Sequence, residues 1–239
     1  MSEANSKFVL YLDIMGFKDR VKNTPIDDLK KDLLEFKNGN KKLRPLLEGP
    51  DGKGKTKNFM QMAQFSDSIV LVSEKDTKDD LNRISKAAVI LMHKAFETGF
   101  AIRGAISLGN MVFDKENQLF FGDALVDAYL LEEELSFYGI VFHYTAEKKV
   151  KEALEANGTL PIENSYIKLK NGISRHYHVA WYKLKDDLSN GDISDKAIKW
   201  LEDLRETVSG NPRVYLDNTR SLIENSTEKN TPKQDNSND

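Results

Sequence analysis

Two aspartates stand where apolar segments with the character of buried strands come to an end. Asp13 follows the run at residues 8–12, and Asp67 lies in the short turn after the segment at residues 56–64. Hard divalent cations bind oxygen atoms, and Mg²⁺ usually takes one or two carboxylates together with substrate phosphates. We therefore predict a metal site at Asp13 and Asp67, with the backbone carbonyl of Ile14 as a further ligand. Taken alone, Asp13 is equally typical of a helix cap and Asp67 of a turn.

The residues after Asp13 favour contact with an anion such as a phosphate. Gly16 and Phe17 lie in the turn from the first strand into a helix, whose free backbone amides attract negative charge. Because Gly16 has no Cβ, the backbone there can approach a phosphate closely. Lys18, in the first helical turn, is expected to contact the terminal phosphates of a substrate, and a solvated helix lysine is the alternative.

Arg103 and the segment at residues 56–64 supply the other candidates. Arg103 interrupts an apolar strand, where burying a charge is costly unless it has a partner. We expect its guanidinium to act on the substrate, with a structural ion pair as the alternative. By strand alternation, Phe59 and Gln61 share a face with Asp67, which suits stacking on and hydrogen bonding to a pyrimidine ring. A strand packed into the core explains the same pattern.

The elements that position these residues follow from hydrophobic periodicity. We expect strands at residues 7–14, 56–64, 68–73, 101–107 and 111–113, and helices at 26–36, 81–95 and 124–135. This order predicts an α+β fold, a ferredoxin-like βαββαβ sheet with helices on one face. In that sheet the first strand and the hairpin around Asp67 are neighbours, so the two aspartates meet at one edge.

The remainder of the chain adds C-terminal strands and a helix. Short strands are expected at 140–142, 166–169 and 176–181, and a helix around 198–208. The polar residues after 225 are typical of disorder. We therefore divide the chain into a catalytic domain, a C-terminal helical extension and a disordered tail, at residues 1–182, 183–225 and 226–239.

Composition narrows the class of protein. The chain has 239 residues, a formal net charge of -3 and no cysteine. The absence of cysteine excludes disulfides and thiolate chemistry, and the near-neutral balance gives no general attraction to nucleic acid or anionic membranes. No apolar run approaches the ~20 residues of a membrane helix, and no secretion signal is apparent. We expect a cytoplasmic protein with no nucleic-acid or membrane partner, in which the scattered histidines are structural.

One sequence motif matches a phosphate-binding loop but lies between the wrong kinds of element. Residues 49–56, Gly-Pro-Asp-Gly-Lys-Gly-Lys-Thr, match the phosphate-binding pattern G-x-x-x-x-G-K-[ST]. That motif works between a strand and a following helix, because loop amides and the helix N-terminus cradle the phosphates together. Here a helical stretch precedes the motif and a strand follows it. We expect a solvated glycine-rich loop, which disfavours a Walker-type ATPase.

Four ordered segments between residues 7 and 135 resemble the class III nucleotidyl cyclases. Residues 13–17 look like the family's first metal motif and 65–68 like its second metal aspartate; residues 103–109 and 121–132 resemble its R-x-G-I-x-x-G strand and W-G-D-x-V-N-x-A-x-R-x-E helix. The resemblance implies that a nucleoside triphosphate is cyclised with loss of pyrophosphate, using two divalent cations, Mn²⁺ or Mg²⁺, held by Asp13 and Asp67. It also implies a homodimer with shared active sites.

Departures from that pattern narrow the range of nucleotide substrates that the resemblance implies. The asparagine and arginine that stabilise the transition state in adenylyl and guanylyl cyclases fall at Val126 and Leu130, and the purine-reading residues fall near Ala63 and Leu119. With the strand at 177–181, this combination resembles the pyrimidine cyclases of bacterial anti-phage Pycsar systems. The resemblance implies that UTP, or next CTP, is converted to a cyclic monophosphate that activates a separate effector.

Other functions remain open. A purine cyclase with altered base contacts needs the same metal site. A catalytically inactive nucleotide-binding module is favoured by Val126 and Leu130, but two neighbouring carboxylates repel each other unless a cation lies between them. A polymerase-like palm also places two aspartates on a βαββαβ sheet, yet it needs fingers and thumb domains for which 239 residues leave no room.

Overall fold

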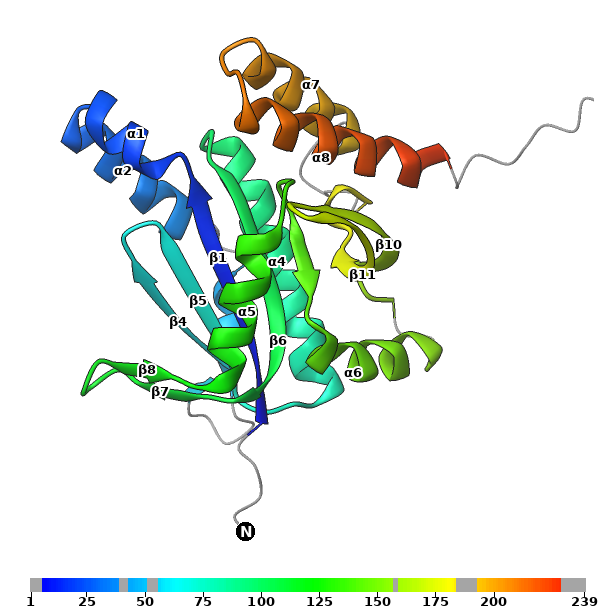
Figure 1. The fold of residues 1–239 in the computed structure, drawn as a ribbon. Coiled ribbons are helices and arrows are strands. Elements are labelled where there is room, and N and C mark those ends of the chain that lie inside the picture. Colours follow the sequence, from blue (N-terminus) through cyan, green and yellow to red (C-terminus); the bar gives the residue numbers. More distant parts are fainter. Residues whose placement is uncertain (1–5, 39–42, 51–55, 157–158, 184–192, 229–239) are drawn as a thin grey trace, which may run out of the picture.

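A computed structural model describes residues 6–38, 43–50, 56–156, 159–183 and 193–228 (Figure 1). Its main sheet has the strand order β10-β11-β9-β6-β1-β5-β4. These strands are β1 Ser6–Met15, β4 Met60–Phe65, β5 Ser68–Ser73, β6 Ala101–Asn110, β9 Ile140–Phe142, β10 Ile162–Leu169 and β11 Gly172–Val179. Two small ribbons pair β2 Glu48–Pro50 with β3 Thr56–Asn58, and β7 Val112–Asp114 with β8 Leu119–Phe121.

Helices cover this sheet and extend beyond it. They are α1 Phe17–Asn23, α2 Ile26–Asn38, α3 Arg44–Leu47, α4 Lys78–Glu97, α5 Asp123–Glu134, α6 Tyr144–Glu155, the 3-10 turn Trp181–Lys183, α7 Ile193–Arg205 and α8 Asn211–Glu228. None of the described helices is long and apolar enough to cross a membrane.

The centre of the sheet confirms the predicted fold class. Strands β6, β1, β5 and β4 lie side by side and are all antiparallel. With α2 between the first two strands in chain order and α4 between the last two, this is the ferredoxin-like βαββαβ arrangement. Strand β9 adds to it in parallel with β6, and the hairpin of β10 and β11 continues the sheet beyond β9.

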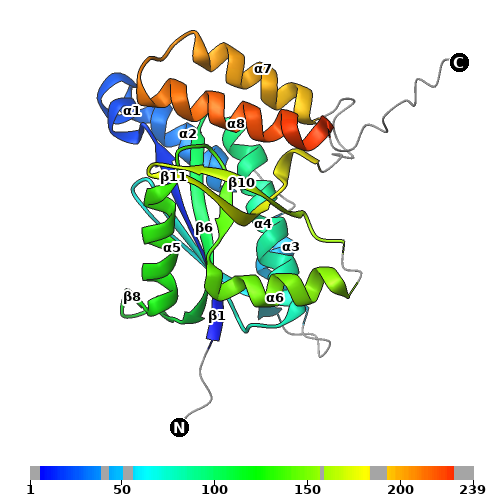
Figure 2. The ribbon, with the colours of Figure 1, turned by 45° about the vertical axis from the view of Figure 1, so that its right-hand side comes forward.

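The alternation of β1 divides the core between the two faces of the sheet. The large cluster built with α2 and α4 contains every second residue of the strand, namely Phe8, Leu10, Leu12 and Ile14. The intervening Val9 and Tyr11 pack against the side that α5 covers. Figure 2 shows α4 and α5 on opposite sides of the sheet. The βαββαβ helices therefore share one face, as predicted, while the following helix α5 covers the other.

The C-terminal part differs most from the prediction. Helix α6 was not anticipated, and the single expected C-terminal helix is a pair, α7 and α8, joined around Gly210 with φ 67°. Helix α8 continues to Glu228, past residue 226, where the tail was expected to begin. Leu201 of α7 and Leu216 of α8 belong to the main core cluster. Residues 51–55, most of the glycine-rich motif, lie outside the described residues, but strand β3 follows them, as expected.

Candidate active site

The end of β1 carries Asp13 onto the face of the sheet that α5 covers. Its Cα partners are Ser68 on β5 and Arg103 on β6, so Asp13 sits between two paired strands. Residues that face each other across paired strands point to the same side of the sheet. Asp13 is therefore held by the ladder itself, with its neighbours Leu12 and Ile14 anchored in the core on the opposite face.

The turn between β4 and β5 brings Asp67 beside Asp13. Phe65 pairs with Ser68, which leaves only Ser66 and Asp67 in the turn. Ser66 has φ 54°, the left-handed conformation that such a tight hairpin requires. The amide of Ile14 donates a hydrogen bond to the backbone carbonyl of Asp67 at 3.0 Å. The predicted meeting of the two aspartates at one edge is thus present in the backbone.

The two carboxylates form a site of concentrated negative charge. Burial raises the pKa of Asp13 above its ordinary value, the charge of Asp67 raises it further, and the Arg103 guanidinium opposes this rise. Glu133 on α5 acts in the same direction as Asp67. A cation bound between the aspartates would relieve this repulsion, because an opposite charge favours the ionised form of a carboxyl group.

This donor set fits a hard divalent cation. Among the described residues, no group of three or more His, Cys, Asp or Glu side chains could hold a metal ion. The site therefore offers a carboxylate pair, which matches Mg²⁺ binding by one or two carboxylates with substrate phosphates and water completing the shell. Cation binding at this pair, a second cation and the Ile14 carbonyl as a ligand all stay predictions.

The turn after β1 has the predicted backbone conformation, but the side chains of Phe17 and Lys18 lie in different surroundings. Gly16 has φ 71°, which favours glycine, and no atom lies within 4 Å of the position that a Cβ would take. The Lys18 side chain is exposed at the start of α1, free to meet a substrate. The ring of Phe17 packs against the core cluster on the opposite face from Asp13, so only its backbone is near the aspartates.

The Arg103 guanidinium is bound by other groups of the protein. It is 7% exposed, its Nε donates to Glu132 on α5, and its Nη1 donates to the Leu135 carbonyl at 3.0 Å. Burial raises the pKa of Glu132 to about 6 despite this partner. The structure thus shows the ion pair that was the alternative for Arg103, which fixes the C-terminal end of α5 against the sheet. A direct role for Arg103 on the substrate stays a prediction.

Phe59 and Gln61, which were predicted to share a face of the sheet, do not do so. The prediction that Phe59 shares a face with Asp67 is wrong, because the chain bends at Phe59 between β3 and β4 and the strand alternation is broken. The Phe59 ring lies instead under the Arg83 guanidinium, 3.9 Å from its centroid. Gln61 does lie on the Asp13 face, opposite Val72. It stands four residues from Phe65, roughly 13 Å along the strand.

Sequence reasoning missed two tyrosines beside the aspartates. Tyr11 lies on the Asp13 face, and its hydroxyl is 2.8 Å from the Ser68 Oγ. Tyr129 on α5 meets the Tyr11 ring edge-on at 5.5 Å between centroids, and a hydrogen bond with Glu133 raises the pKa of Tyr129. Tyr11 could have been found by strand alternation, since it stands two residues before Asp13. No comparable pattern in the sequence singles out Tyr129.

Several apolar side chains near the candidate site in the sequence are exposed. Val126 and Leu130 are 53% and 54% exposed on α5, Phe65 is 51% exposed at the hairpin tip, and Phe121 is 57% exposed on β8. The two positions that depart from the cyclase pattern are therefore both apolar and exposed.

Comparisons with protein-family models and with curated proteins found no match to this chain. Among solved structures, a bacterial light-regulated adenylyl cyclase is similar with a TM-score of 0.46 and 11% sequence identity. The likeness covers 87% of this chain and 58% of that structure, so this chain spans little more than half of its length. The fold assignment rests on the strand order described above.

Proposed function

We propose that the chain is a nucleotidyl cyclase, which converts a nucleoside triphosphate to its 3′,5′-cyclic monophosphate and pyrophosphate. The observation that carries this proposal is the meeting of Asp13 and Asp67 at one sheet edge, joined by the 3.0 Å hydrogen bond from Ile14 to the Asp67 carbonyl. The sequence resemblance supplies the reaction, and the βαββαβ sheet supplies the positions that the reaction needs.

The residues of this chain have separate tasks in that reaction. Asp13 and Asp67 would hold two divalent cations, which, when bound, lower the pKa of the attacking 3′-hydroxyl and neutralise the departing pyrophosphate. The backbone at Gly16 leaves open space for phosphate oxygens, and the exposed Lys18 would contact the terminal phosphates. Arg103, through Glu132, holds α5 and Tyr129 against β1. Most of the catalysis is then positioning and charge stabilisation.

We propose a pyrimidine substrate, UTP first and CTP next. The support is the resemblance to pyrimidine cyclases and the absence of purine-reading side chains at Ala63 and Leu119. Ala63 lies on the Asp13 face, opposite Val70, where a small side chain leaves room. On the same resemblance, the cyclic product would activate a separate effector in anti-phage defence, in the cytoplasm.

A homodimer is part of the proposal. A second copy would bury exposed apolar side chains of α5 and the hairpin tip, such as Val126, Leu130 and Phe65. On the resemblance to class III cyclases, the two copies would share their active sites.

A catalytically inactive nucleotide-binding module is the second candidate. The observation that favours it is the exposed apolar character of Val126 and Leu130, which offer no hydrogen bonds to a transition state. Such a module would bind nucleoside triphosphates in a cation-dependent manner without turnover.

A turnover assay separates these functions. The purified chain would be incubated with Mn²⁺ and each of ATP, GTP, CTP and UTP separately, and the products identified by mass spectrometry, with Asp67→Ala as the control. A cyclic pyrimidine monophosphate that is absent from the variant supports the proposal. A cyclic purine monophosphate favours the purine cyclase. Cation-dependent binding without a cyclic product favours the inactive module.

A further inference from the structure

A second cavity, separate from the aspartate site, lies between edge strand β10 and helix α8. Its volume is about 540 Å³, and it is lined by residues 137, 165–168 and several positions of α8. Small-molecule sites in proteins usually have volumes of roughly 300–1,000 Å³ and combine an apolar lining with a few polar groups. None of the residues assigned to the candidate active site lines this cavity.

The floor of the cavity is apolar and firmly packed. Phe137 and Ile167 are 2% and 1% exposed, and Leu222 of α8 packs against the same cluster. That cluster also includes Ala105 on β6 and Ala128 on α5. The floor is therefore continuous with the protein core, and an apolar ring face is suited to it.

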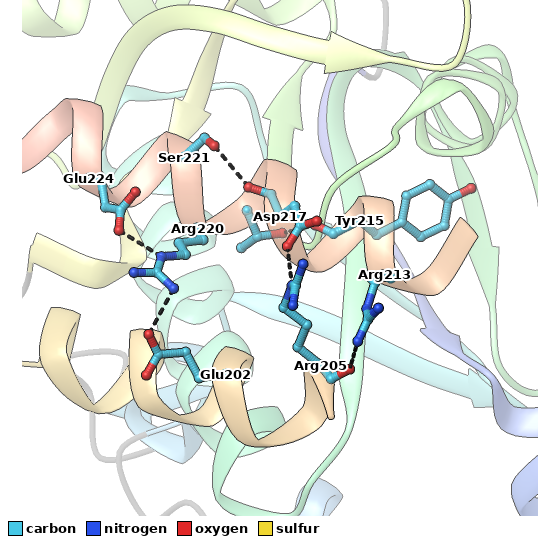
Figure 3. A network of polar contacts seen from close by, with 9 residues as sticks. Glu202, Arg205, Arg213, Tyr215, Asp217, Arg220, Ser221 and Glu224 are labelled. Atoms are coloured by element: carbon cyan, nitrogen blue, oxygen red, sulfur yellow. Dashed lines mark hydrogen bonds and ion pairs between the residues drawn. The ribbon is translucent and has the colours of Figure 1, made fainter. Parts of the chain in front are cut away.

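The wall formed by α8 is fixed on both sides. Toward α7, Arg220 pairs with Glu202 and Arg205 pairs with Asp217 (Figure 3). Toward the sheet, the Asn218 amide donates to the Ser136 carbonyl at 2.7 Å. A wall held in this way is preformed, which lowers the entropic cost of binding a ligand.

The rim of the cavity carries polar groups of a particular kind. Ser165 on β10 and Asn225 on α8 present a hydroxyl and a side-chain amide from opposite walls, and Ser226 closes one end. A side-chain amide both donates and accepts, so it can pair with the donor and acceptor edge of a nucleobase. Tyr166, 71% exposed beside the Arg175 guanidinium, lies on the other face of β10 from Ser165 and Ile167.

The charge of the cavity favours one anionic group. Lys168 is exposed at the rim and has no ion-pair partner among the described residues. The described lining holds no Asp or Glu side chain. Glu163, which accepts a hydrogen bond from Ser226 behind the lining, is already paired with Lys183. A ligand phosphate at Lys168 would therefore meet a cation that no described carboxylate neutralises.

We propose that this cavity binds a nucleoside monophosphate, linear or cyclic. Lys168 at the strand edge would bind the phosphate, Asn225 and Ser165 would bind polar edges of the base and ribose, and the apolar floor would support the ring. The site is independent of the reaction proposed for Asp13 and Asp67, because its residues, its charge and its cavity are separate.

Calorimetric titration of the full chain tests this site. The probes are uridine 5′-monophosphate, 3′,5′-cyclic UMP, uridine and inorganic phosphate, all in EDTA, so that a cation-dependent site at Asp13 and Asp67 stays silent. The variants are Lys168→Ala, its matched control Lys170→Ala on the same exposed segment, and Asp67→Ala. A fourth, Ser165→Trp, fills the cavity; circular dichroism checks the fold of each.

The expected result is saturable binding of at least one mononucleotide to the wild type, to Lys170→Ala and to Asp67→Ala. Lys168→Ala should weaken that binding about tenfold, the usual contribution of one charge-assisted hydrogen bond. Uridine, which lacks the phosphate, should bind more weakly than either mononucleotide and be unaffected by Lys168→Ala. Comparison of the linear and cyclic probes assigns the form of the phosphate.

Several results would overturn the site. They are no saturable binding of either mononucleotide, an equal effect of the two lysine variants, loss of binding in Asp67→Ala, and binding of inorganic phosphate as tight as that of a mononucleotide. Should Ser165→Trp fail to fold, the comparison of Lys168→Ala with Lys170→Ala decides alone, since both side chains are exposed. Failure of cyclase turnover would leave this result unaffected.

Discussion

The α7–α8 hairpin and the sheet edge at Asp13 and Asp67 differ in how their acidic side chains are compensated. In the hairpin, Asp217 is paired with Arg205, and Glu202 and Glu224 are both paired with Arg220 (Figure 3). These pairs lie on exposed helix faces, where each one contributes little to stability by itself.

At the sheet edge the aspartates have no such partner. Neither Asp13 nor Asp67 forms an ion pair with any residue that the structure describes, although both are partly buried. The nearby guanidinium of Arg103 is committed to Glu132. We therefore expect the aspartate pair, unlike these paired acidic groups of the hairpin, to attract a cation from outside the chain.

The largest effect is expected from breaking the buried pair that takes Arg103 away from the aspartates. Arg103→Met leaves Glu132 buried without its partner, which should cost about 3–5 kcal/mol of unfolding free energy. Denaturant unfolding measures this. The double variant Arg103→Met/Glu132→Met should recover most of the loss, because no isolated charge remains. A single variant within about 1 kcal/mol of the wild type would contradict the pairing.

Next in size is the pH dependence due to His178, a buried titratable group with no ion-pair partner in the part of the chain that the structure describes. It is 1% exposed, and burial lowers its pKa to about 4. The unfolded chain binds the proton more readily, so this contribution to stability is present above pH 6.5 and lost as the pH falls toward 4. The loss should be roughly 3 kcal/mol.

Unfolding free energies at pH 7 and pH 4.5 measure this contribution. His178→Phe should lack it. An unchanged pH dependence in His178→Phe would assign it to other groups.

A smaller gain is expected from removing the unpaired charge at the sheet edge. Because the pKa of Asp13 is raised in the folded protein, its ionised form destabilises the fold. Asp13→Asn should raise the unfolding free energy by about 1 kcal/mol or less in EDTA, and the gain should vanish as the pH falls below the ordinary aspartate range. Asp217→Asn, a paired control, should show no gain. A loss in Asp13→Asn under these conditions would mean that its carboxylate is structurally paired.

The smallest effect is expected in the hairpin. Arg220→Gln removes the partner of Glu202 and Glu224 on exposed faces. The cost should be about 0.2–1 kcal/mol and should shrink in high salt, because exposed ion pairs are screened. Thermal unfolding at low and high salt measures it. A loss of stability as large as that of Arg103→Met would show that the exposed ion pairs of the hairpin are as strong as the buried pair.

Much of the fold was predictable because its core obeys simple periodicity. The alternating sides of β1 and the helical spacing in α4 each bury one face, and they specify the βαββαβ order and the meeting of Asp13 with Asp67. Helix α6 was missed because its buried positions, Ala146, Val150 and Ala153, are small and stand out weakly in a polar segment.

Side-chain roles were less predictable than backbone positions. Alternation placed Gln61 correctly but failed at Phe59, since a bend between β3 and β4 leaves no mark in hydrophobicity. Arg103 found its partner in Glu132, twenty-nine residues away, and such a pairing depends on how α5 crosses the sheet. The cavity beside Lys168 arises where β10 meets α8, two elements whose contact no local pattern specifies.

Direct measurement of Mn²⁺ binding tests the central claim that Asp13 and Asp67 form a cation site. Electron paramagnetic resonance would follow free Mn²⁺ during titration of the wild type, Asp13→Asn, Asp67→Asn and the paired-acid control Asp217→Asn, with a non-hydrolysable nucleoside triphosphate analogue present. The account predicts saturable binding to the wild type and to Asp217→Asn that either sheet-edge variant weakens at least tenfold. Equal Mn²⁺ binding by all four proteins, or none by the wild type, would contradict it.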